Sequence, residues 1–206
     1  MAESYIKRIR RYGKYLFEWI FKEKIHGLDF TMRDAHLLSE TDGRLHGYSK
    51  TDEAHAKKIF EALGVDKEKR LLDVGCGKGA FLREASKYPF GKIAGIEIDN
   101  ALVKTAKKNF EILNLDKRVS IYCTDALKFE HYNLFNVFYF FNPFDKEIMT
   151  EVVKKIKNSR EHYRKYYIIL HNPVCAEVIE ENGGKLAEKL YDEMKSYETH
   201  IYECEG

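Results

Sequence analysis

The stretch Leu71-Leu72-Asp73-Val74-Gly75-Cys76-Gly77-Lys78-Gly79 decides the fold, because an apolar run leads into three glycines at alternate positions. The apolar run is typical of a buried strand, and the residues after the last glycine have helical spacing. Glycines let the backbone turn sharply and let a ligand approach without meeting a Cβ atom. The following helix presents free amides at its N-terminus. The stretch therefore predicts a ligand-binding turn between a strand and a helix.

Strand-like and helix-like segments alternate around this turn. Strands are expected at residues 71–74, 92–98, 119–123, 137–141, 166–171 and 199–204, and helices at 80–88, 100–113, 146–159 and 174–182. A preceding helix is expected to start at Thr51 or Asp52 as its cap and to end at Gly64. Residues 185–194 fit a helix or a strand equally well. This alternation predicts parallel strands joined by right-handed crossovers.

Composition restricts the class of protein. With 206 residues, 44% hydrophobic, the chain is long enough for one domain and an appendage, and a net charge of +2 does not by itself indicate a nucleic-acid or membrane partner. The four cysteines are scattered and the histidines lack metal-ligand spacing, so we expect no metal site and no disulfide framework. No apolar run is long enough to span a bilayer. We expect a cytoplasmic protein.

The N-terminal residues are basic. Residues 1–24 hold seven Lys or Arg against three Glu, and their apolar residues recur at helical spacing. We expect residues 1–50 to form a helical extension that packs on a domain of residues 51–206 and helps to cover its active site. Contact with RNA phosphates or with a membrane surface is left open.

Three acidic residues lie at or near the carboxyl ends of three expected strands. Asp73, two residues before Gly75, suits an ammonium group and is awkward beside a pyrophosphate. Glu97, at the end of the second strand, can accept both hydroxyls of a ribose, and Asp125, after the third, can accept an adenine amino group. Ammonium, ribose and adenine together describe S-adenosylmethionine. Asp99 is expected to cap the helix that starts near residue 100.

Residues 71–144 resemble class I S-adenosylmethionine-dependent methyltransferases, with Asp73 to Gly79 matching the D-x-G-x-G-x-G motif, Glu97 the ribose acid and Asp125-Ala126 the adenine position. The resemblance implies a Rossmann-like, doubly wound seven-stranded α/β sheet whose last strand is antiparallel, which requires a strand within residues 185–194. It implies S-adenosylhomocysteine as product and these cofactor-binding residues: Tyr48, Thr51, Asp73, Gly75, Cys76, Gly77, Gly79, Glu97, Ile98, Asp125, Ala126 and Asn142. Tyr48 as a packing residue and Thr51 as a helix cap remain equal alternatives.

The segment Asn142-Pro143-Phe144 ends the fourth strand abruptly, since proline has no amide hydrogen for a sheet ladder. Methyltransferases of this class place a motif here that faces the transferred methyl. The Asn142 carbonyl could orient an amino nucleophile and Phe144 could wall the pocket, which favours a nitrogen acceptor. The alternative is an ordinary turn. Asn172-Pro173 repeats the pattern after the fifth strand, beside His171, the one histidine expected near the cleft.

A narrower likeness covers most of the chain. Gly27-Leu28-Asp29, Gly47-Tyr48-x-x-Thr51 and Phe141-Asn142-Pro143-Phe144 resemble uncharacterised bacterial methyltransferases distantly similar to Dot1-type enzymes, with Phe30 and Lys50 in place of the expected Thr and Pro. This likeness leaves the acceptor and the oligomeric state open.

Two other functions remain possible from the sequence. One is an NAD-dependent oxidoreductase, since Gly75, Gly77 and Ala80 also fit the dinucleotide fingerprint. The other is a non-catalytic protein that binds the cofactor or RNA.

Overall fold

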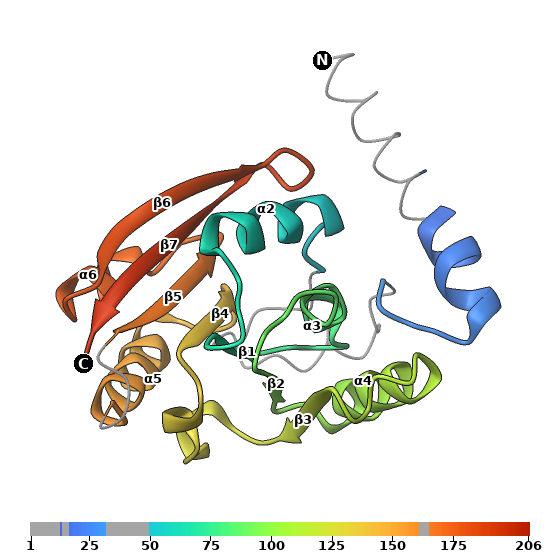
Figure 1. Cartoon of the computed structure of the whole chain (residues 1–206), viewed down its shortest axis with the longest axis horizontal. Helices are drawn as coiled ribbons and strands as arrows, with labels where there is room; N and C mark the ends of the chain where they lie inside the picture. The colour runs from blue at the N-terminus through green and yellow to red at the C-terminus, as the bar shows by residue number, and fades with distance from the viewer. Residues whose placement is uncertain (1–12, 14–16, 32–49, 161–164) are drawn as a thin grey trace.

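A computed structural model describes residues 13, 17–31, 50–160 and 165–206. A seven-stranded sheet lies between two layers of helices (Figure 1). The strands are β1 (Arg70–Val74), β2 (Lys92–Glu97), β3 (Val119–Cys123), β4 (Val137–Phe141), β5 (Lys165–His171), β6 (Lys185–Asp192) and β7 (Tyr197–Glu205). Their order is β3-β2-β1-β4-β5-β7-β6, and β7 runs antiparallel to both of its neighbours. The expected seven-stranded sheet with an antiparallel last strand is confirmed.

The ambiguous segment is β6, the edge strand. Most of its side chains are exposed and several are charged, and it pairs only through its antiparallel ladder with β7. A low content of apolar residues is normal in a strand at the edge of a sheet. Lysine and glutamate side chains there also discourage pairing with strands of other chains. This polarity is why the periodicity of the sequence did not distinguish a strand from a helix.

Three of the helices begin at acidic caps. Asp52 accepts from the amide of Ala54 at the start of α2 (Glu53–Leu63), Asp99 caps α4 (Asn100–Ile112) and Asp145 caps α5 (Lys146–Asn158). Gly64 ends α2 in the left-handed conformation, as expected. Asp52 rather than Thr51 is thus the cap of α2.

Two helices are shorter than predicted. Helix α3 (Ala80–Ala85) ends before residue 88, and the chain continues in turns toward Pro89. Helical backbone is unfavourable for the residue that precedes a proline. Helix α6 (Ala176–Glu181) starts late, after a turn in which the Val174 amide donates to the Asn172 carbonyl. Short 3-10 turns, η4 (Ala126–Lys128) and η5 (Tyr132–Leu134), connect β3 to β4.

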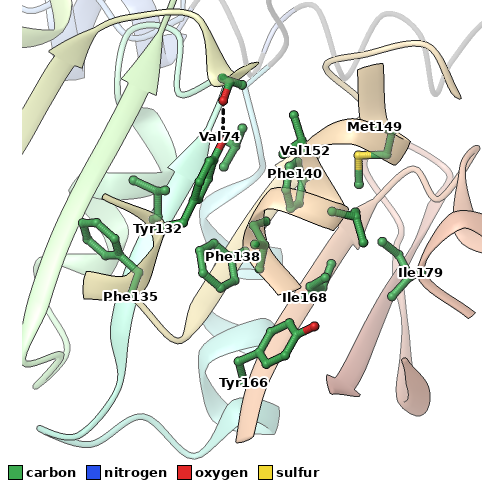
Figure 2. Close-up of a cluster of buried hydrophobic side chains, with 14 of the residues drawn as sticks. Val74, Tyr132, Phe135, Phe138, Phe140, Met149, Val152, Tyr166, Ile168 and Ile179 are labelled. Carbon is green, nitrogen blue, oxygen red and sulfur yellow. Dashed lines mark hydrogen bonds between the residues drawn. The ribbon is translucent and has the colours of Figure 1, made fainter. Parts of the chain in front are cut away.

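The core has two halves, one on each face of the sheet. Phe138 and Phe140 of β4 pack with α5, α6 and the β3–β4 connection (Figure 2), whereas Val137 and Tyr139 face α2, α3 and α4. Alternate strand residues point to opposite faces, so a strand covered on both sides is apolar throughout. This explains the unbroken run of large side chains in β4.

The N-terminal extension is described only in part. The predicted amphipathic helix falls largely outside the described residues, as does Tyr48. What is described is a π-helical turn η1 (Glu18–Glu23), a 3-10 turn η2 (Lys24–His26) and the residues up to 31. Among the described helices, none combines the length and apolar character that crossing a bilayer requires.

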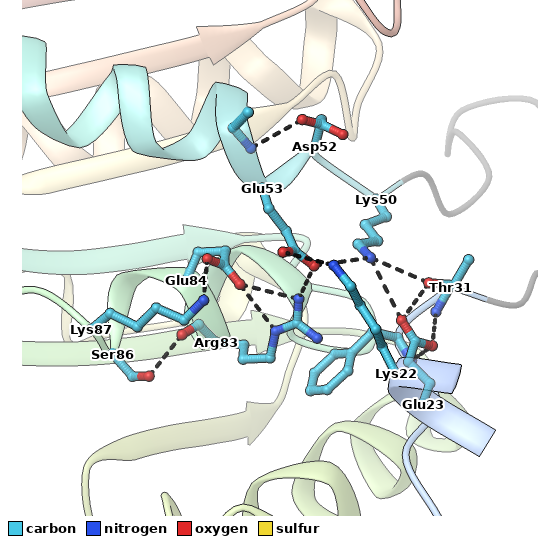
Figure 3. A network of polar contacts seen from close by, with 12 residues as sticks. Lys22, Glu23, Thr31, Lys50, Asp52, Glu53, Arg83, Glu84, Ser86 and Lys87 are labelled. Carbon is cyan, nitrogen blue, oxygen red and sulfur yellow. Dashed lines mark hydrogen bonds and ion pairs between the residues drawn. The ribbon is translucent and has the colours of Figure 1, made fainter. Parts of the chain in front are cut away.

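A polar network joins this extension to the domain (Figure 3). The buried Glu23 carboxylate accepts from the amides of Phe30 and Thr31, both at 2.8 Å, and pairs with Lys50 at 3.5 Å. Glu53 and Arg83 continue the network with a contact of 2.5 Å. The extension is therefore anchored through buried charges as well as by apolar packing.

Candidate functional site

The glycine turn follows β1 and leads into α3, as predicted. Gly75, Gly77 and Gly79 have φ values of 82°, 53° and 84°, in the left-handed region that favours glycine. The amides of Gly75 and Cys76 both donate to the Ile96 carbonyl, at 2.9 and 3.0 Å. The turn is thereby fastened to the end of β2.

The Asn-Pro motif lies against this turn. A Cβ atom built at Gly75 would stand 2.9 Å from the Cβ of Pro143, which is closer than real contacts allow. Asn142 has a φ of 42°. Asparagine tolerates left-handed backbone, yet a residue before proline is sterically restricted, and such strain is concentrated at functional sites. The structure thus brings two predicted motifs, 68 residues apart in sequence, into contact.

Asp73 lies at the base of the turn and is buried. Burial raises the pKa of its carboxyl group well above the usual value, and the charge of Glu97 raises it further. Within the described part of the chain, this carboxylate has no hydrogen-bond partner. A buried acid without a partner is costly in isolation and fits a cationic ligand group. The residues present therefore fit the ammonium group of S-adenosylmethionine.

Glu97 ends β2 and is largely buried. Its Oε2 accepts from the Gly77 amide and its Oε1 from the Asp99 amide, each at 3.0 Å. Burial raises the pKa of Glu97, and these hydrogen bonds act in the opposite direction. The carboxylate shapes the turn in addition to standing where a ribose acid is expected. Asp99 caps α4, accepting from the amides of Ala101 and Leu102, as predicted.

Three expected cofactor-binding residues, Ile98, Asp125 and Ala126, lie at or just beyond the ends of β2 and β3. The Ile98 side chain is 51% exposed, available to stack on a flat ring. Asp125 accepts from the Leu127 amide at 2.8 Å and so caps η4, which leaves its second carboxylate oxygen for an adenine amino group. Ala126 is buried beneath this turn. The Thr124 amide donates to the Glu97 carbonyl at 2.9 Å, which holds the two strand ends together.

Two predicted residues have side chains that point into the core. The Cys76 sulfur packs against Gly95, where an added Cβ would stand 2.6 Å from it, so Cys76 offers the turn its backbone only. The Thr51 hydroxyl lies 2.6 Å from the hydroxyl of Tyr139 and is buried. Cofactor contact by Thr51 stays a prediction.

A pocket lies between the ends of β4 and β5. Both Asn-Pro pairs line it, Asn142-Pro143 from β4 and Asn172-Pro173 from β5, together with Phe144 and Cys175. Asn172 also has a left-handed φ, 56°. Phe144 packs against the core below, so it walls one side of the pocket. The two Asn-Pro turns and Phe144 thus line a small space, and Pro143, which lies against Gly75, connects it to the glycine turn.

Sequence reasoning missed the support beneath the turn. The Lys78 ammonium is buried and pairs with Asp29 at 2.7 Å. Asn109 donates to the carbonyls of Asp29 and Lys78, and accepts from the Asp29 amide. The only signal was the quoted Gly27-Leu28-Asp29 motif, whose contact with the turn no spacing rule indicates. His171, expected near the cleft, directly precedes Asn172 of the pocket and is fully buried, and burial lowers its pKa to about 3.

Known proteins resemble this chain in sequence. The family model for ribosomal RNA adenine dimethylase matches residues 50–191. The polyamine aminopropyltransferase of Clostridioides difficile is 40% identical over 65 residues, 30% of this chain and 23% of that protein. The tRNA1(Val) (adenine(37)-N6)-methyltransferase of Vibrio campbellii is 31% identical over 64 residues, 31% of this chain and 27% of that protein. The matches thus span about a quarter of these two relatives.

Solved structures resemble it in fold. The RNA methyltransferase from Salinibacter ruber, in complex with S-adenosyl-L-homocysteine, has a TM-score of 0.59 at 18% identity and covers 76% of this chain and 93% of its own. At this identity the likeness concerns the fold, which is that of class I methyltransferases, as the family resemblance implied. The family model, in contrast, covers well over half of the 206 residues. The chain belongs to the ribosomal RNA adenine dimethylase family.

Proposed function

We propose that this protein transfers a methyl group from S-adenosylmethionine to a nitrogen atom of its acceptor. The observation that carries the proposal is the packing of Pro143 on Gly75, which puts the Asn142 backbone and side chain beside the cofactor turn. The cofactor supplies an activated methyl group on a positively charged sulfur, so the protein has mainly to align the reactants.

Each predicted cofactor-binding residue contacts a different part of the cofactor. Asp73 pairs with the ammonium group, Glu97 accepts the ribose hydroxyls, and Ile98 and Asp125 hold the adenine. The amides of the glycine turn and the N-terminus of α3 line the entrance to the cofactor site. Support comes from the lack of a partner for the Asp73 carboxylate among the described residues and from the exposure of Ile98. Asp73 also disfavours an NAD-dependent oxidoreductase, because its carboxylate would stand near a pyrophosphate.

The acceptor is an exocyclic amino group, and an adenine base in RNA is the class that the family match favours. The Asn142 carbonyl oxygen accepts one hydrogen of the amino group, which orients the nitrogen lone pair toward the methyl carbon. Phe144 stacks on the flat base. An unstacked or single-stranded adenine can enter such a pocket, whereas a paired one must first be extruded.

Three finer predictions belong to this proposal. These are the likeness to uncharacterised bacterial Dot1-like enzymes, the cytoplasmic location, and the division at residue 50 between an extension and the catalytic domain. The buried network around Glu23 supports treating residues 17–31 as an attached part of the domain rather than as a separate unit.

Calorimetric titration with S-adenosylhomocysteine tests the cofactor site, because this product needs no acceptor to bind. We expect micromolar binding that is lost in Asp73→Ala and in Glu97→Ala. Glu151→Ala, which removes an exposed acid on α5 paired with Lys154, serves as the matched control and keeps full affinity. Absence of binding to the unchanged protein would contradict the cofactor assignment.

Methyl transfer is then measured with labelled cofactor on unmodified ribosomal and transfer RNA, followed by nucleoside mass spectrometry. Asn142→Ala is expected to lower the rate by roughly 10²- to 10³-fold, the loss typical of a donor or acceptor aligned on the reacting group. Asn172→Ala, on the other side of the pocket, tests whether the effect is specific to Asn142. Methylation of RNA at a carbon or at ribose oxygen would overturn the nitrogen assignment.

A further inference from the structure

A buried cluster of two histidines and an aspartate lies outside the proposed cofactor pocket. His55 comes from α2, His171 from the end of β5 and Asp192 from the end of β6. All three are almost entirely buried, at 3%, 0% and 1% exposure. One ligand atom from each lies within 4.8 Å of the other two. Three distant parts of the sequence thus converge on one point in the interior.

The atoms that meet there lack hydrogen-bond partners. Across the described residues, only four side-chain nitrogen or oxygen atoms are sealed from solvent and have no partner, and three belong to this cluster: His55 Nδ1, His171 Nε2 and Asp192 Oδ2. An unsatisfied buried polar atom is costly, and native proteins hold few of them. Their concentration in one place therefore indicates a missing ligand rather than three separate defects.

The opposite atoms of the same side chains are all engaged. His55 Nε2 and His171 Nδ1 both lie 2.7 Å from the Thr199 hydroxyl, which has two lone pairs and can accept from both rings. Asp192 Oδ1 accepts from the amides of Met194 and Lys195 at 2.9 and 3.1 Å. Hydrogen bonds of this kind fix the ring orientation and tautomer of metal-binding histidines. They leave a lone pair free on each unpartnered atom.

The charge of Asp192 is also uncompensated. In the part of the chain that the structure describes, no lysine or arginine forms an ion pair with it, and its nearest ionisable partner is His171, with Nε2 3.4 Å from Oδ2. Burial lowers the pKa of both histidines, so neither ring carries a compensating charge at neutral pH. A buried carboxylate beside two neutral imidazoles matches the donor set of a divalent transition-metal ion.

We propose that His55, His171 and Asp192 bind one divalent first-row transition-metal ion of the zinc class, with a fourth position left for water. Tetrahedral ligands about 2.0–2.1 Å from such an ion stand roughly 3.4 Å apart. Because the three ligand atoms all lie within 4.8 Å of one another, the widest separation closes by at most about 1.4 Å on binding.

The proposed metal site connects three elements near the strand ends at which the acceptor pocket lies. It joins α2 and β5 to the β6–β7 hairpin, and His171 directly precedes Asn172 of the pocket. The His171 ring also contacts the Phe141 ring, with centroids 4.2 Å apart, and Phe141 directly precedes Asn142. Through these contacts the bound ion holds the two Asn-Pro turns in place. This inference does not depend on the proposed methyl transfer.

The test is titration of the EDTA-treated full chain with Co²⁺, followed by visible absorption, and with Zn²⁺, followed by thermal unfolding. Asp192→Asn is the principal variant because its amide keeps the hydrogen bonds from residues 194 and 195 and can donate to His171, so the fold is preserved. His200→Gln is the matched control, a buried histidine next to Thr199 that bonds to Glu198 and Tyr202 instead. Circular dichroism and S-adenosylhomocysteine binding verify folding of each variant.

We expect one equivalent of Co²⁺ with the intense visible bands of a tetrahedral nitrogen and oxygen site, and a rise in unfolding temperature with Zn²⁺. Asp192→Asn should weaken binding by at least about 10- to 100-fold, the loss seen when even an outer hydrogen-bond partner of a metal ligand is removed, and His200→Gln should not. Three results would overturn the proposal: no binding to the unchanged chain, binding retained in Asp192→Asn, or sulfur-to-cobalt charge-transfer bands that place the ion on cysteine. The first would leave the cluster as an internal His–Asp contact.

Discussion

Pro143 lies so close to Gly75 that a single added methyl group at residue 75 would stand 2.9 Å from the proline Cβ. The contact joins the turn after β1 to the turn after β4, the two neighbouring strands at the centre of the sheet. It fixes how far the proposed acceptor motif stands from the proposed cofactor turn.

Gly75→Ala should therefore destabilise the protein by two separate effects. Left-handed backbone costs a residue with a Cβ about 1–2 kcal/mol, and the overlap with Pro143 adds about 1–3 kcal/mol. Gly64→Ala is the matched control, since Gly64 has a φ of 60° and nothing within 4 Å of an added Cβ, so it isolates the backbone effect. Urea denaturation measures both variants.

The double variant Gly75→Ala with Pro143→Gly separates the overlap from the strain. Removing the proline ring relieves the overlap but not the left-handed backbone, so the two substitutions should couple by about 1 kcal/mol or more in a double-mutant cycle. If the two changes in unfolding free energy are simply additive, or if Gly75→Ala and Gly64→Ala lose the same stability, the Pro143 contact does not affect stability.

Asp73→Asn is expected to stabilise the ligand-free protein while weakening cofactor binding. Burial raises the pKa of this carboxyl, so the folded state binds its proton more readily than the unfolded state, and stability falls as pH rises above the unfolded pKa. Removing the charge should recover about 1 kcal/mol at neutral pH, a rise of roughly 2–4 °C in Tm for a chain of this size. Differential scanning calorimetry at pH 7 measures it. A lower Tm in Asp73→Asn would mean that the carboxylate has a stabilising partner.

Affinity for S-adenosylhomocysteine should fall as the pH is lowered. The ammonium group of the ligand pairs with ionised Asp73, whose pKa is raised in the free protein. Binding therefore releases a proton at any pH at which Asp73 is protonated in the free protein. Calorimetry in two buffers with different ionisation enthalpies reports the released protons directly. The pH dependence should flatten in Asp73→Asn. Equal proton release by both proteins would assign the effect to another group, of which Glu97, whose pKa burial also raises, is the nearest.

Glu23→Ala should cost about 3 kcal/mol of unfolding free energy, because it breaks a buried ion pair with Lys50 and leaves the Phe30 and Thr31 amides without their acceptor. Lys154→Ala removes the exposed ion pair with Glu151 on α5 and is expected to change stability by less than about 1 kcal/mol. Both are measured by urea denaturation. A loss in Glu23→Ala no larger than in the surface control would mean that residues 17–31 contribute little to the folded domain.

The sequence by itself determined the parallel core and the glycine turn. Apolar runs such as that of β4 and the helix caps at Asp52 and Asp99 are local signals, since they depend on neighbours within a few residues. The bounds of β3 and β4 were predicted without error, and the acids at the strand ends followed once the strands were placed. The direction of β7 came instead from the family resemblance.

Tertiary structure alone decided the rest, because those features depend on contacts between residues far apart in the chain. Nothing local indicates that Lys78 is buried on Asp29, that the Thr51 hydroxyl bonds to Tyr139, or that β6 is a strand, whose polar pattern reflects its place at the sheet edge. The same holds for the buried histidine cluster, since 116 residues separate His55 from His171 and only the sheet order brings them together. Spacing rules find ligands that share a turn or a helix, and a site assembled across a sheet has no such spacing.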